Sequence, residues 1–324
     1  MVKPKAGNIM MKKISSISLL CLFFIFACSS PVVKRNFKTK EEGKKGLGYQ
    51  NSAAMFSDSV RKKVALLAFF NEAPYGGDDL AIITTQELTN ELGRTKEFIL
   101  DTVANKTFGT SKEIYVGGGQ KLAQMSREAK INGVNFVMYG RIIDARIREK
   151  ADEIGLVRKV KAYTETSLEV RIFDISSNKE IFTEIVKGYA DDSTYRFFRT
   201  EREGQLDYRR NLLRYSAKIA ARKIIPKVVE VAAKYDWVGR VAKIISNKIF
   251  INAGRLSGIN VGDVLKVMTE GTEIYDPETG ALIGVSKGHV KGTIEVIDYF
   301  GEDGSVAILH SGGSVLEGDY VQLY

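Results

Sequence analysis

The stretch that most constrains the fold covers residues 134–146, V-N-F-V-M-Y-G-R-I-I-D-A-R. It follows an amphipathic pattern over residues 120–131, and Asn132-Gly133 can supply the left-handed residue that ends a helix. The stretch itself is rich in Val, Phe, Ile and Tyr, which favours a buried strand. A helix that leads through Asn-Gly into a buried strand predicts an α/β layer.

The preceding segments extend this α/β pattern. Residues 64–70 form a continuous apolar run, which is typical of a strand buried on both faces. Residues 78–92 have helical periodicity, with Asp78-Asp79 as the expected N-cap and Gly93 as the expected end. Residues 97–103 indicate a second strand. We interpret Gly117-Gly118-Gly119 as a turn before the helix at 120–131, because the pattern of a phosphate-binding loop is absent.

The segments after residue 146 predict a hairpin and a long helix. Residues 163–175 alternate between polar and apolar, as a half-exposed strand does. Residues 176–179 have turn chemistry, and residues 180–189 return as the partner strand. Residues 205–235 have apolar positions at helical spacing, and we expect Pro226 to kink this helix.

From Trp237 onward the sequence changes to short strands punctuated by glycine. Seven such strands are spaced closely enough to predict a small closed or near-closed β-barrel, and A-L-I-G-V-S at 281–286 is one of them. Residues 276–280, D-P-E-T-G, indicate a hairpin turn and lack the ligands of a calcium site. The chain is therefore predicted to be α+β: an α/β sandwich with a mixed sheet, followed by a small all-β barrel.

The N-terminus predicts export and lipid attachment. Met10-Met11-Lys12-Lys13 and the apolar run 14–26 are typical of a secretory signal, and the run is too short to remain as a membrane-spanning helix. Residues 25–29, I-F-A-C-S, resemble a bacterial lipobox in which Cys28 would be acylated; ordinary secretory cleavage is the alternative. Ser29 after this cysteine resembles lipoproteins that are passed on to the outer membrane.

These observations divide the chain into four segments. They are a signal peptide (1–27), the lipidated Cys28 with a flexible tether (28–60), the α/β domain (61–235) and the barrel domain (236–324). The tether is polar and basic, so it cannot bury enough apolar surface to order itself, and its root-mean-square reach is roughly 30 Å.

Charge and cysteine content exclude several functions. The net charge of +9 comes from residues 1–63, which contain 13 basic and 3 acidic residues, whereas residues 64–324 contain 35 and 36. We therefore expect no nucleic-acid binding. Both cysteines, Cys21 and Cys28, lie near the N-terminus, so the folded part has no disulfide and no thiolate site.

No residue pattern indicates catalysis. His289 and His310 are the only histidines, and both lie in the barrel without a partnering Cys or His. We predict no enzyme activity, no catalytic residue, no cofactor and no metal site. The α/β half contains no histidine for a catalytic triad.

One cluster is a candidate surface for partners. Residues 195–227 contain 10 Lys or Arg against 3 acidic residues, and a solvated outer helix face is the alternative interpretation. The candidate contact residues are Arg196, Phe197, Phe198, Arg199, Arg202, Arg209 and Arg210.

Two parts of the sequence resemble known families. V-A-L-L-A-F-F-N, L-A-Q-M-S-R-E-A-K-I-N-G-V-N-F-V-M-Y-G-R-I and S-L-E-V-R-I-F-D-I-S-S-N-K-E-I, within residues 61–190, resemble the CsgG-type periplasmic domain. That group has a CsgG/TolB-N-like sandwich and includes penicillin-binding-protein activator lipoproteins and the middle domain of flagellar assembly protein T. N-A-G-R-L-S-G-I-N-V-G-D, D-P-E-T-G-A-L-I-G and E-G-D-Y-V resemble the C-terminal domain of flagellar assembly protein T.

The resemblance implies an outer-membrane lipoprotein that faces the periplasm and scaffolds an envelope machine, most simply a flagellar basal-body ring. Its partners would be the outer membrane, through the anchor, and envelope or flagellar proteins; contact with peptidoglycan and a homo-oligomer are compatible with it. A regulator of a peptidoglycan synthase is one alternative. A CsgG-like secretion channel is another, but the best hairpin for it, residues 145–162, has no face that stays apolar across a bilayer.

Overall fold

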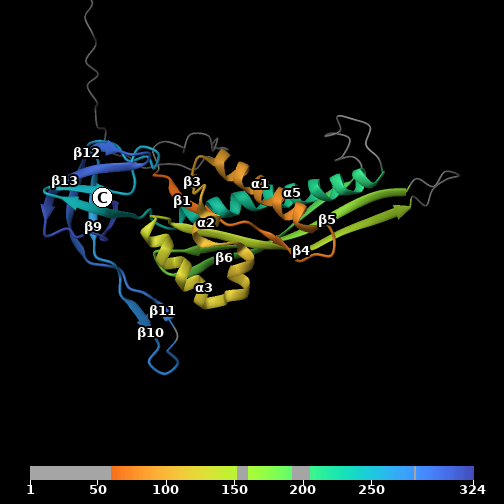
Figure 1. Cartoon of the computed structure of the whole chain (residues 1–324), viewed down its shortest axis with the longest axis horizontal. Helices are drawn as coiled ribbons and strands as arrows, with labels where there is room; N and C mark the ends of the chain where they lie inside the picture. Colours follow the sequence, from red (N-terminus) through yellow and green to blue (C-terminus); the bar gives the residue numbers. More distant parts are fainter. Residues whose placement is uncertain (1–59, 152–159, 192–204, 281) are drawn as a thin grey trace, which may run out of the picture. The chain divides into compact units, whose positions relative to one another are not determined.

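The computed structural model describes residues 60–151, 160–191, 205–280 and 282–324. They belong to one compact unit that extends from Ala53 to Tyr324. They form a six-stranded mixed sheet with helices, followed by a closed six-stranded barrel (Figure 1). The predicted α+β class is confirmed. The predicted signal peptide, Cys28 and most of the predicted tether lie outside the described residues.

The sheet is mixed because its first strands run parallel and its later strands form hairpins. In order across the sheet, its strands are β3 (Phe98–Leu100), β1 (Lys62–Leu66), β4 (Phe136–Ala151), β5 (Val160–Asp174) and β6 (Lys179–Asp191), and β2 (Phe70–Asn71) pairs with β4. β1 is parallel to both of its neighbours, β3 and β4, whereas β5 is antiparallel to both of its neighbours, β4 and β6. The predicted hairpin around residues 176–179 is confirmed.

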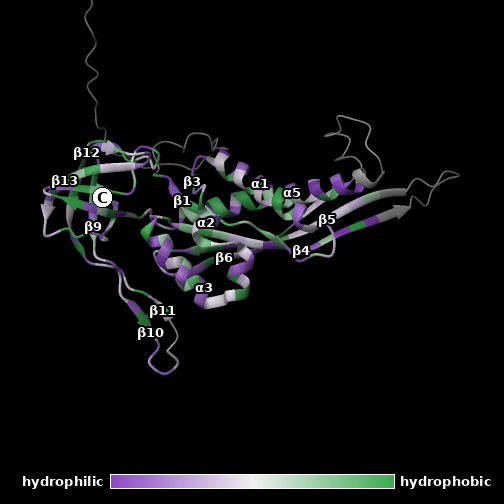
Figure 2. Ribbon diagram, in the orientation of Figure 1, coloured by the Kyte–Doolittle hydropathy of each residue, from purple (hydrophilic) through white to green (hydrophobic). Residues whose placement is uncertain are grey.

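Helices pack on both faces of the sheet. α1 (Gly77–Thr95) and α5 (Gln205–Ala233) share one buried cluster with the sheet, and α2 (Ala104–Phe108) and α3 (Ser111–Ile131) share the other. Val64 and Leu66 of β1 belong to the first cluster and Ala65 to the second, so β1 is buried on both faces, as its apolar sequence predicted. Figure 2 shows that α1 and α5 carry both hydrophobic and hydrophilic residues, as expected of helices with one buried side.

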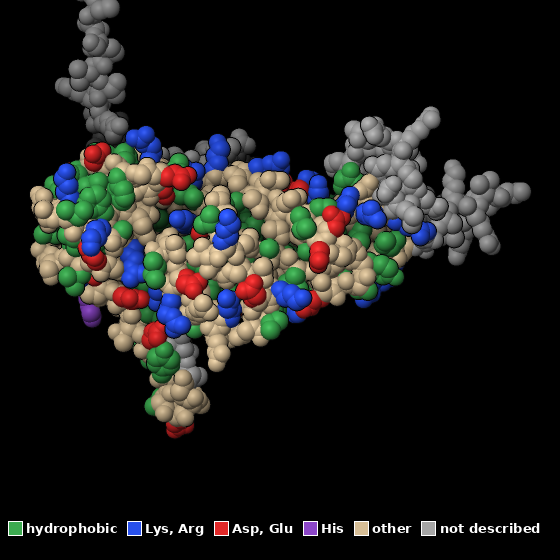
Figure 3. Space-filling model, in the orientation of Figure 1, with side chains coloured by type: hydrophobic (Ala, Val, Ile, Leu, Met, Phe, Trp, Pro, Cys, Tyr) green, Lys and Arg blue, Asp and Glu red, His purple; other side chains and the backbone are tan. Residues whose placement is uncertain are grey.

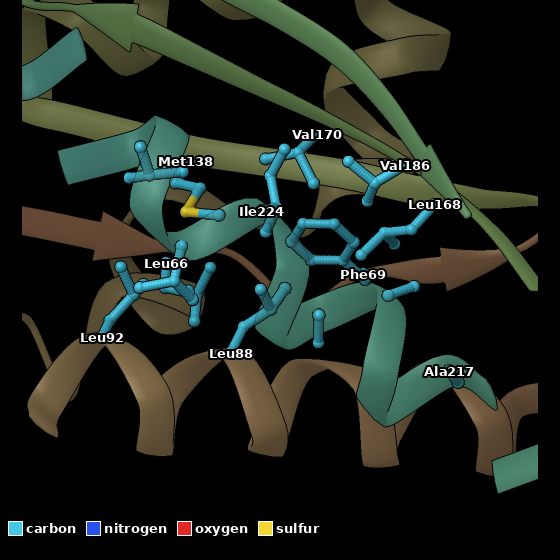
Figure 4. Packing of buried hydrophobic residues seen from close by; sticks show 14 of the residues in the cluster. Leu66, Phe69, Leu88, Leu92, Met138, Leu168, Val170, Val186, Ala217 and Ile224 are labelled. Carbon is cyan, nitrogen blue, oxygen red and sulfur yellow. The ribbon is translucent and has the colours of Figure 1, made fainter. Parts of the chain in front are cut away.

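The larger core lies between the sheet and the helices α1 and α5. Leu88 and Leu92 of α1 and Ile224 of α5 point toward Met138 and Val170 of the sheet (Figure 4). Each of these five side chains is at most 1% exposed. Burial of one such aliphatic side chain contributes about 1.5–3 kcal/mol, so this layer holds the long α5 on the sheet.

The beginning and end of α1 differ from the prediction. The N-cap residue is Gly76, with φ 92°, and Asp78 and Asp79 lie in the first turn, where their charges favour the positive end of the helix dipole. Gly93 is part of the helix, which ends at Lys96 with φ 59°. The expected Asp cap and Gly end were therefore wrong.

α3 begins nine residues earlier than predicted, at Ser111 rather than residue 120. Thr110 and Glu113 form a capping box there, which satisfies the first free backbone N–H groups. Gly118 has φ 53° and ψ −139°, so the three glycines form a kink within the helix and not a turn before it. At the other end, Asn132 is the C-cap and Gly133 has φ 67°, as predicted.

The second part of the chain is the predicted barrel. Its strands, in order around the barrel, are β12 (Val290–Phe300), β13 (Gly304–Gly312), β8 (Lys248–Ile251), β7 (Gly239–Ile245), β14 (Tyr320–Leu323) and β9 (Val264–Met268). The core inside it includes Trp237, Ile251, Leu265 and Ile294. Closure leaves no free sheet edge between these six strands.

One predicted barrel strand lies elsewhere. β10 (Glu273–Tyr275) and β11 (Leu282–Val285) form a separate two-stranded sheet with each other, and β11 comes from the A-L-I-G-V-S segment that the sequence placed in the barrel. The predicted turn at residues 276–280 joins them: the Asp276 carboxylate accepts hydrogen bonds from the backbone N–H groups of Glu278 and Thr279. Figure 1 shows this hairpin extending away from the barrel.

Candidate partner-binding surfaces

Most of the residues predicted to contact partners, and the predicted lipidation site Cys28, lie outside the described part of the chain. The contact residues concerned are Arg196, Phe197, Phe198, Arg199 and Arg202. Arg209 and Arg210 lie near the beginning of α5, and both have interaction partners within the chain. Their role in partner contact stays a prediction.

The basic residues farther along α5 pair with acidic residues of the same molecule. Arg214 Nη2 lies 2.5 Å from Asp79 Oδ2 of α1, and Arg222 Nη2 lies 2.5 Å from Glu87 Oε1, whose side chain is only 8% exposed. On the other side of α5, Lys227 pairs with Glu184 of β6. These cations therefore hold α5 between α1 and β6, and part of the charge predicted for this strip is neutralised inside the protein.

A buried carboxylate organises the sheet face next to α3. Glu169 of β5 is 4% exposed and accepts hydrogen bonds from Arg141 Nε, at 2.6 Å, and from Arg171 Nη2, at 2.5 Å. Burial alone would raise the pKa of Glu169, but the two guanidinium groups outweigh it and hold the pKa below its usual range. Glu169 is therefore ionised at neutral pH and shared between two cations.

Aromatic rings cover this ion cluster. The guanidinium carbons of Arg141 and Arg171 lie 4.6 Å and 5.2 Å from the centre of the Tyr115 ring of α3, which is within the range of cation–π attraction. The Tyr115 ring also makes edge contacts with Phe70 and Tyr139. Burial is the main cause that raises the pKa of Tyr115 to about 12.

Tyr139 completes the cluster on β4. Its hydroxyl donates a 2.8 Å hydrogen bond to Glu180 Oε2 of β6, and burial together with this bond raises the pKa of Tyr139. Both tyrosines stay protonated at neutral pH and Glu169 stays ionised. None of these groups is poised to exchange a proton near pH 7, so the cluster fits a structural role better than acid–base catalysis.

Sequence reasoning missed this cluster. A signal was present, because Arg141 interrupts a mainly apolar strand, and Glu169 and Arg171 lie at alternate positions of the next one, on one side. The strand register places Arg141 opposite Glu169, and Tyr139 opposite Arg171. The contact between these side chains could be predicted only from the register of β4 and β5, which the sequence does not give.

Farther along the strands, the same side of the sheet is exposed. We call this surface the open sheet face and define it by Arg146 and Arg148 of β4 and Ile185, Lys187 and Tyr189 of β6. Ile185 is 53% exposed and Tyr189 is 51% exposed, and all three charged residues are exposed as well. Large apolar side chains among charged ones on an exposed strand are typical of an interaction surface.

The opposite side of these strands is covered by α5. Ala145 of β4 is fully buried, and Ile147 packs against the same cluster as Ala217 and Ala220 of α5. Gly188 of β6 lies directly against the α5 backbone. The hairpin at residues 145–162 was the best candidate for a channel element. Its first strand, which belongs to β4, therefore packs its less charged side against α5.

The histidines lie on the barrel surface. His289 and His310 are both exposed, and His310 Nδ1 lies 3.7 Å from Glu295 Oε2. Among the described residues, His, Cys, Asp and Glu side chains nowhere gather in a group of three or more that could hold a metal ion. In the same part of the chain, no helix is both long enough and apolar enough to cross a membrane.

About half of this chain is similar to solved structures of other proteins. No family model and no curated protein matches the chain. Matching solved structures include the hypothetical protein CT253 from Chlamydia trachomatis, with 17% identity and a TM-score of 0.36 over 54% of this chain and 100% of that one. Lipoprotein GNA1162 from Neisseria meningitidis matches with 12% identity and a TM-score of 0.27, over 54% and 99% of the two chains. The C-terminal domain of LpoB from Salmonella enterica matches with 14% identity and a TM-score of 0.26, over 41% and 85%. At these identities and TM-scores the matches do not identify a function.

Proposed function

We propose that this chain is a non-enzymatic lipoprotein that is anchored to the outer membrane, faces the periplasm and binds other proteins of an envelope machine. Support comes first from the sequence, whose signal segment, lipobox cysteine and polar tether resemble those of exported lipoproteins. The folded part adds a surface suited to partners and a buried polar cluster suited to stability.

The open sheet face is the observation that carries this proposal. It presents Ile185, Tyr189 and Lys187 on β6, beside Arg146 and Arg148 on β4, while α5 packs on the other side. β6 forms one edge of the sheet, so a partner could approach both the face and the edge. A rigid sheet that presents exposed aromatic and aliphatic side chains is a suitable platform for protein contacts.

The finer proposal is a part in the flagellar basal-body ring, which rests on the resemblance of residues 237–324 to the C-terminal domain of flagellar assembly protein T. Deletion of the gene, followed by imaging of motors and cell shape, tests it. We expect incomplete motors and normal cell shape. Intact motors with altered wall growth would contradict the scaffold and favour a regulator of a peptidoglycan synthase.

Complementation of the deletion tests the open sheet face. We expect that a chain with Ile185→Ser and Tyr189→Ser folds with an unchanged thermal midpoint but does not restore function. Val116→Ser is the matched control, because Val116 is 81% exposed on α3. If the double variant complements as well as the control does, this face is not the platform.

A further inference from the structure

The hairpin formed by β10 and β11 is a separate structural feature, and we call residues 271–280 and 282–286 the arm. Its root is narrow: a Cβ added to Gly271 would lie 1.9 Å from the carbonyl oxygen of Ser286, and one added to Gly288 would lie 1.8 Å from that of Thr269. Glycine is therefore required where the two chains of the arm pass each other. The arm leaves the barrel at this root, and its two strands are not part of the closed barrel.

The arm exposes large apolar side chains. Ile274 is 48% exposed, Tyr275 is 52% exposed and Ile283 is 53% exposed. An isolated two-stranded hairpin is only marginally stable in water, so exposed apolar side chains on one contribute little to its own folding. They are better explained as a contact surface that a partner covers.

The arm is also acidic. Between Gly271 and Ser286 the sequence contains Glu273, Asp276 and Glu278 and no Lys or Arg. Hydrogen bonds from the backbone and side chain of Thr279, and from the backbone of Glu278, lower the pKa of Asp276, so its charge persists at neutral pH. Figure 3 shows hydrophobic and acidic side chains together on the arm.

One basic side chain of the same molecule lies against the arm, at β11 near its root. The Lys179 ammonium lies 2.9 Å from the position that a Cβ on Gly284 would occupy. Near the tip, the Tyr275 hydroxyl donates a 2.5 Å hydrogen bond to Glu273 Oε2, which fixes this carboxylate beside an exposed ring. The outer part of the arm thus pairs negative charge with apolar surface.

Each strand of the arm has one unpaired edge. Among the described residues, β10 and β11 pair with each other and with no third strand. An open edge of this kind can accept an extended peptide, whose backbone supplies hydrogen bonds and whose side chains read the charges beside it. The acidic and apolar side chains beside this edge favour a bound strand that carries both basic and apolar residues.

We propose that the arm binds an extended, positively charged segment of a partner protein by strand addition. Glu273 and Glu278 attract its Lys or Arg side chains, and Tyr275 and Ile283 contact its apolar side chains. This inference goes beyond the scaffold function, because it concerns one recognition mode of the barrel part. A binding assay decides it independently of any effect on motors or cell wall.

The test measures, by fluorescence anisotropy, how tightly a fluorescein-labelled peptide binds to the full chain. The peptide has eight residues, alternately lysine and valine. We expect this peptide to bind at least tenfold more tightly than a matched glutamate–valine peptide, and to weaken as salt is raised. Glu273→Lys with Glu278→Lys should lower the affinity at least tenfold, and Ile283→Ser should lower it several-fold. Either of these Glu→Lys substitutions alone should also lower it, whereas Glu302→Lys, a single substitution of the same kind on an exposed barrel turn, should leave it within twofold.

Three outcomes would overturn the proposal. Equal binding of both peptides would show that charge does not select the ligand. An equal loss in the Glu302→Lys control would show that the peptide senses only the net charge of the protein. Concentration-dependent dimers that Ile283→Ser abolishes would make a second copy of this chain the occupant of the arm.

Discussion

Gly188 of β6 lies against Ser216 of α5 so closely that a Cβ on the glycine would be 1.9 Å from the serine carbonyl oxygen. The hydroxyl of Ser216 is buried as well, 2.6 Å from Thr166 Oγ1 on the neighbouring strand β5. Helix and sheet therefore approach at backbone distance where small residues meet. This contact lies behind the open sheet face and fixes its position relative to α5.

Gly188→Ala is expected to destabilise the protein by about 1–3 kcal/mol, because the methyl group has to displace backbone and not a flexible side chain. Chemical denaturation measures the change. Gly93→Ala is the matched control: it lies in α1 with no atom within 4 Å of its added Cβ, so we expect it to stabilise by about 0.5–1 kcal/mol. If both variants change stability in the same direction, the close packing of α5 on β6 is not as described.

Glu169→Gln tests the buried ion cluster through its pH dependence. We expect a loss of about 2–3 kcal/mol at neutral pH, because the two arginines lose their shared charge. The pKa of Glu169 is depressed in the folded state from an ordinary value of 4.5, so its contribution is fully present above pH 4.5 and is lost as pH falls through the folded pKa. Wild type and variant should therefore converge in stability in acid.

Urea denaturation at a series of pH values provides this measurement. Glu302→Gln, on the exposed turn between β12 and β13, is the control and should stay within about 0.5 kcal/mol of wild type throughout. A difference between wild type and Glu169→Gln that stays constant down to pH 2 would show that the carboxylate charge of Glu169 is not what stabilises the cluster.

Asn135→Ala is expected to destabilise the junction between the sheet and the barrel. Asn135 is 6% exposed; its Oδ1 accepts from the backbone N–H of Lys63 at 2.8 Å, and its Nδ2 donates to the carbonyl oxygen of Val238 at 2.7 Å. Loss of both bonds should cost about 2–4 kcal/mol. Thermal unfolding measures this, and Asn90→Ala, on the exposed side of α1, should be neutral or slightly stabilising. Equal midpoints for the two variants would contradict a structural role for Asn135.

Membrane attachment is predicted to depend on Cys28. Metabolic labelling with a clickable fatty acid should mark the wild-type chain, and Cys28→Ala should remove the label and release the chain from the membrane fraction. Cys21→Ala is the control, because Cys21 lies within the apolar run of the signal segment and should not affect acylation. Label that survives Cys28→Ala would exclude this anchor.

Local sequence signals predicted the α/β framework well. The joint at Asn132-Gly133 and the turn at residues 176–179 were correct, because each depends on a few neighbouring residues with well-defined backbone preferences. The three glycines at 117–119 were misread for the same reason. Alone they favour a turn, but the Thr110–Glu113 capping box and the burial of Ile114 extend the helix upstream of them.

Long-range pairing set the limit of sequence prediction. An apolar strand such as β11 does not reveal which strand it pairs with, so the sequence placed it in the barrel although it forms the arm. The Arg141–Glu169–Arg171 cluster was missed in the same way, since Arg141 and Glu169 are 28 residues apart in the chain. Their contact depends on register, which composition and spacing do not encode.

The central position of β1 has a consequence for export. Val64 of β1 pairs with Phe136 of β4 and shares its buried cluster with Val228 of α5, so the first strand of the folded part is covered only when about 160 further residues have arrived. At a synthesis rate of roughly 5–20 residues per second, that takes roughly 10–30 s. An apolar strand has to remain unaggregated during this time. We therefore expect β1 to stay uncovered, and open to a chaperone, until the long helix has followed.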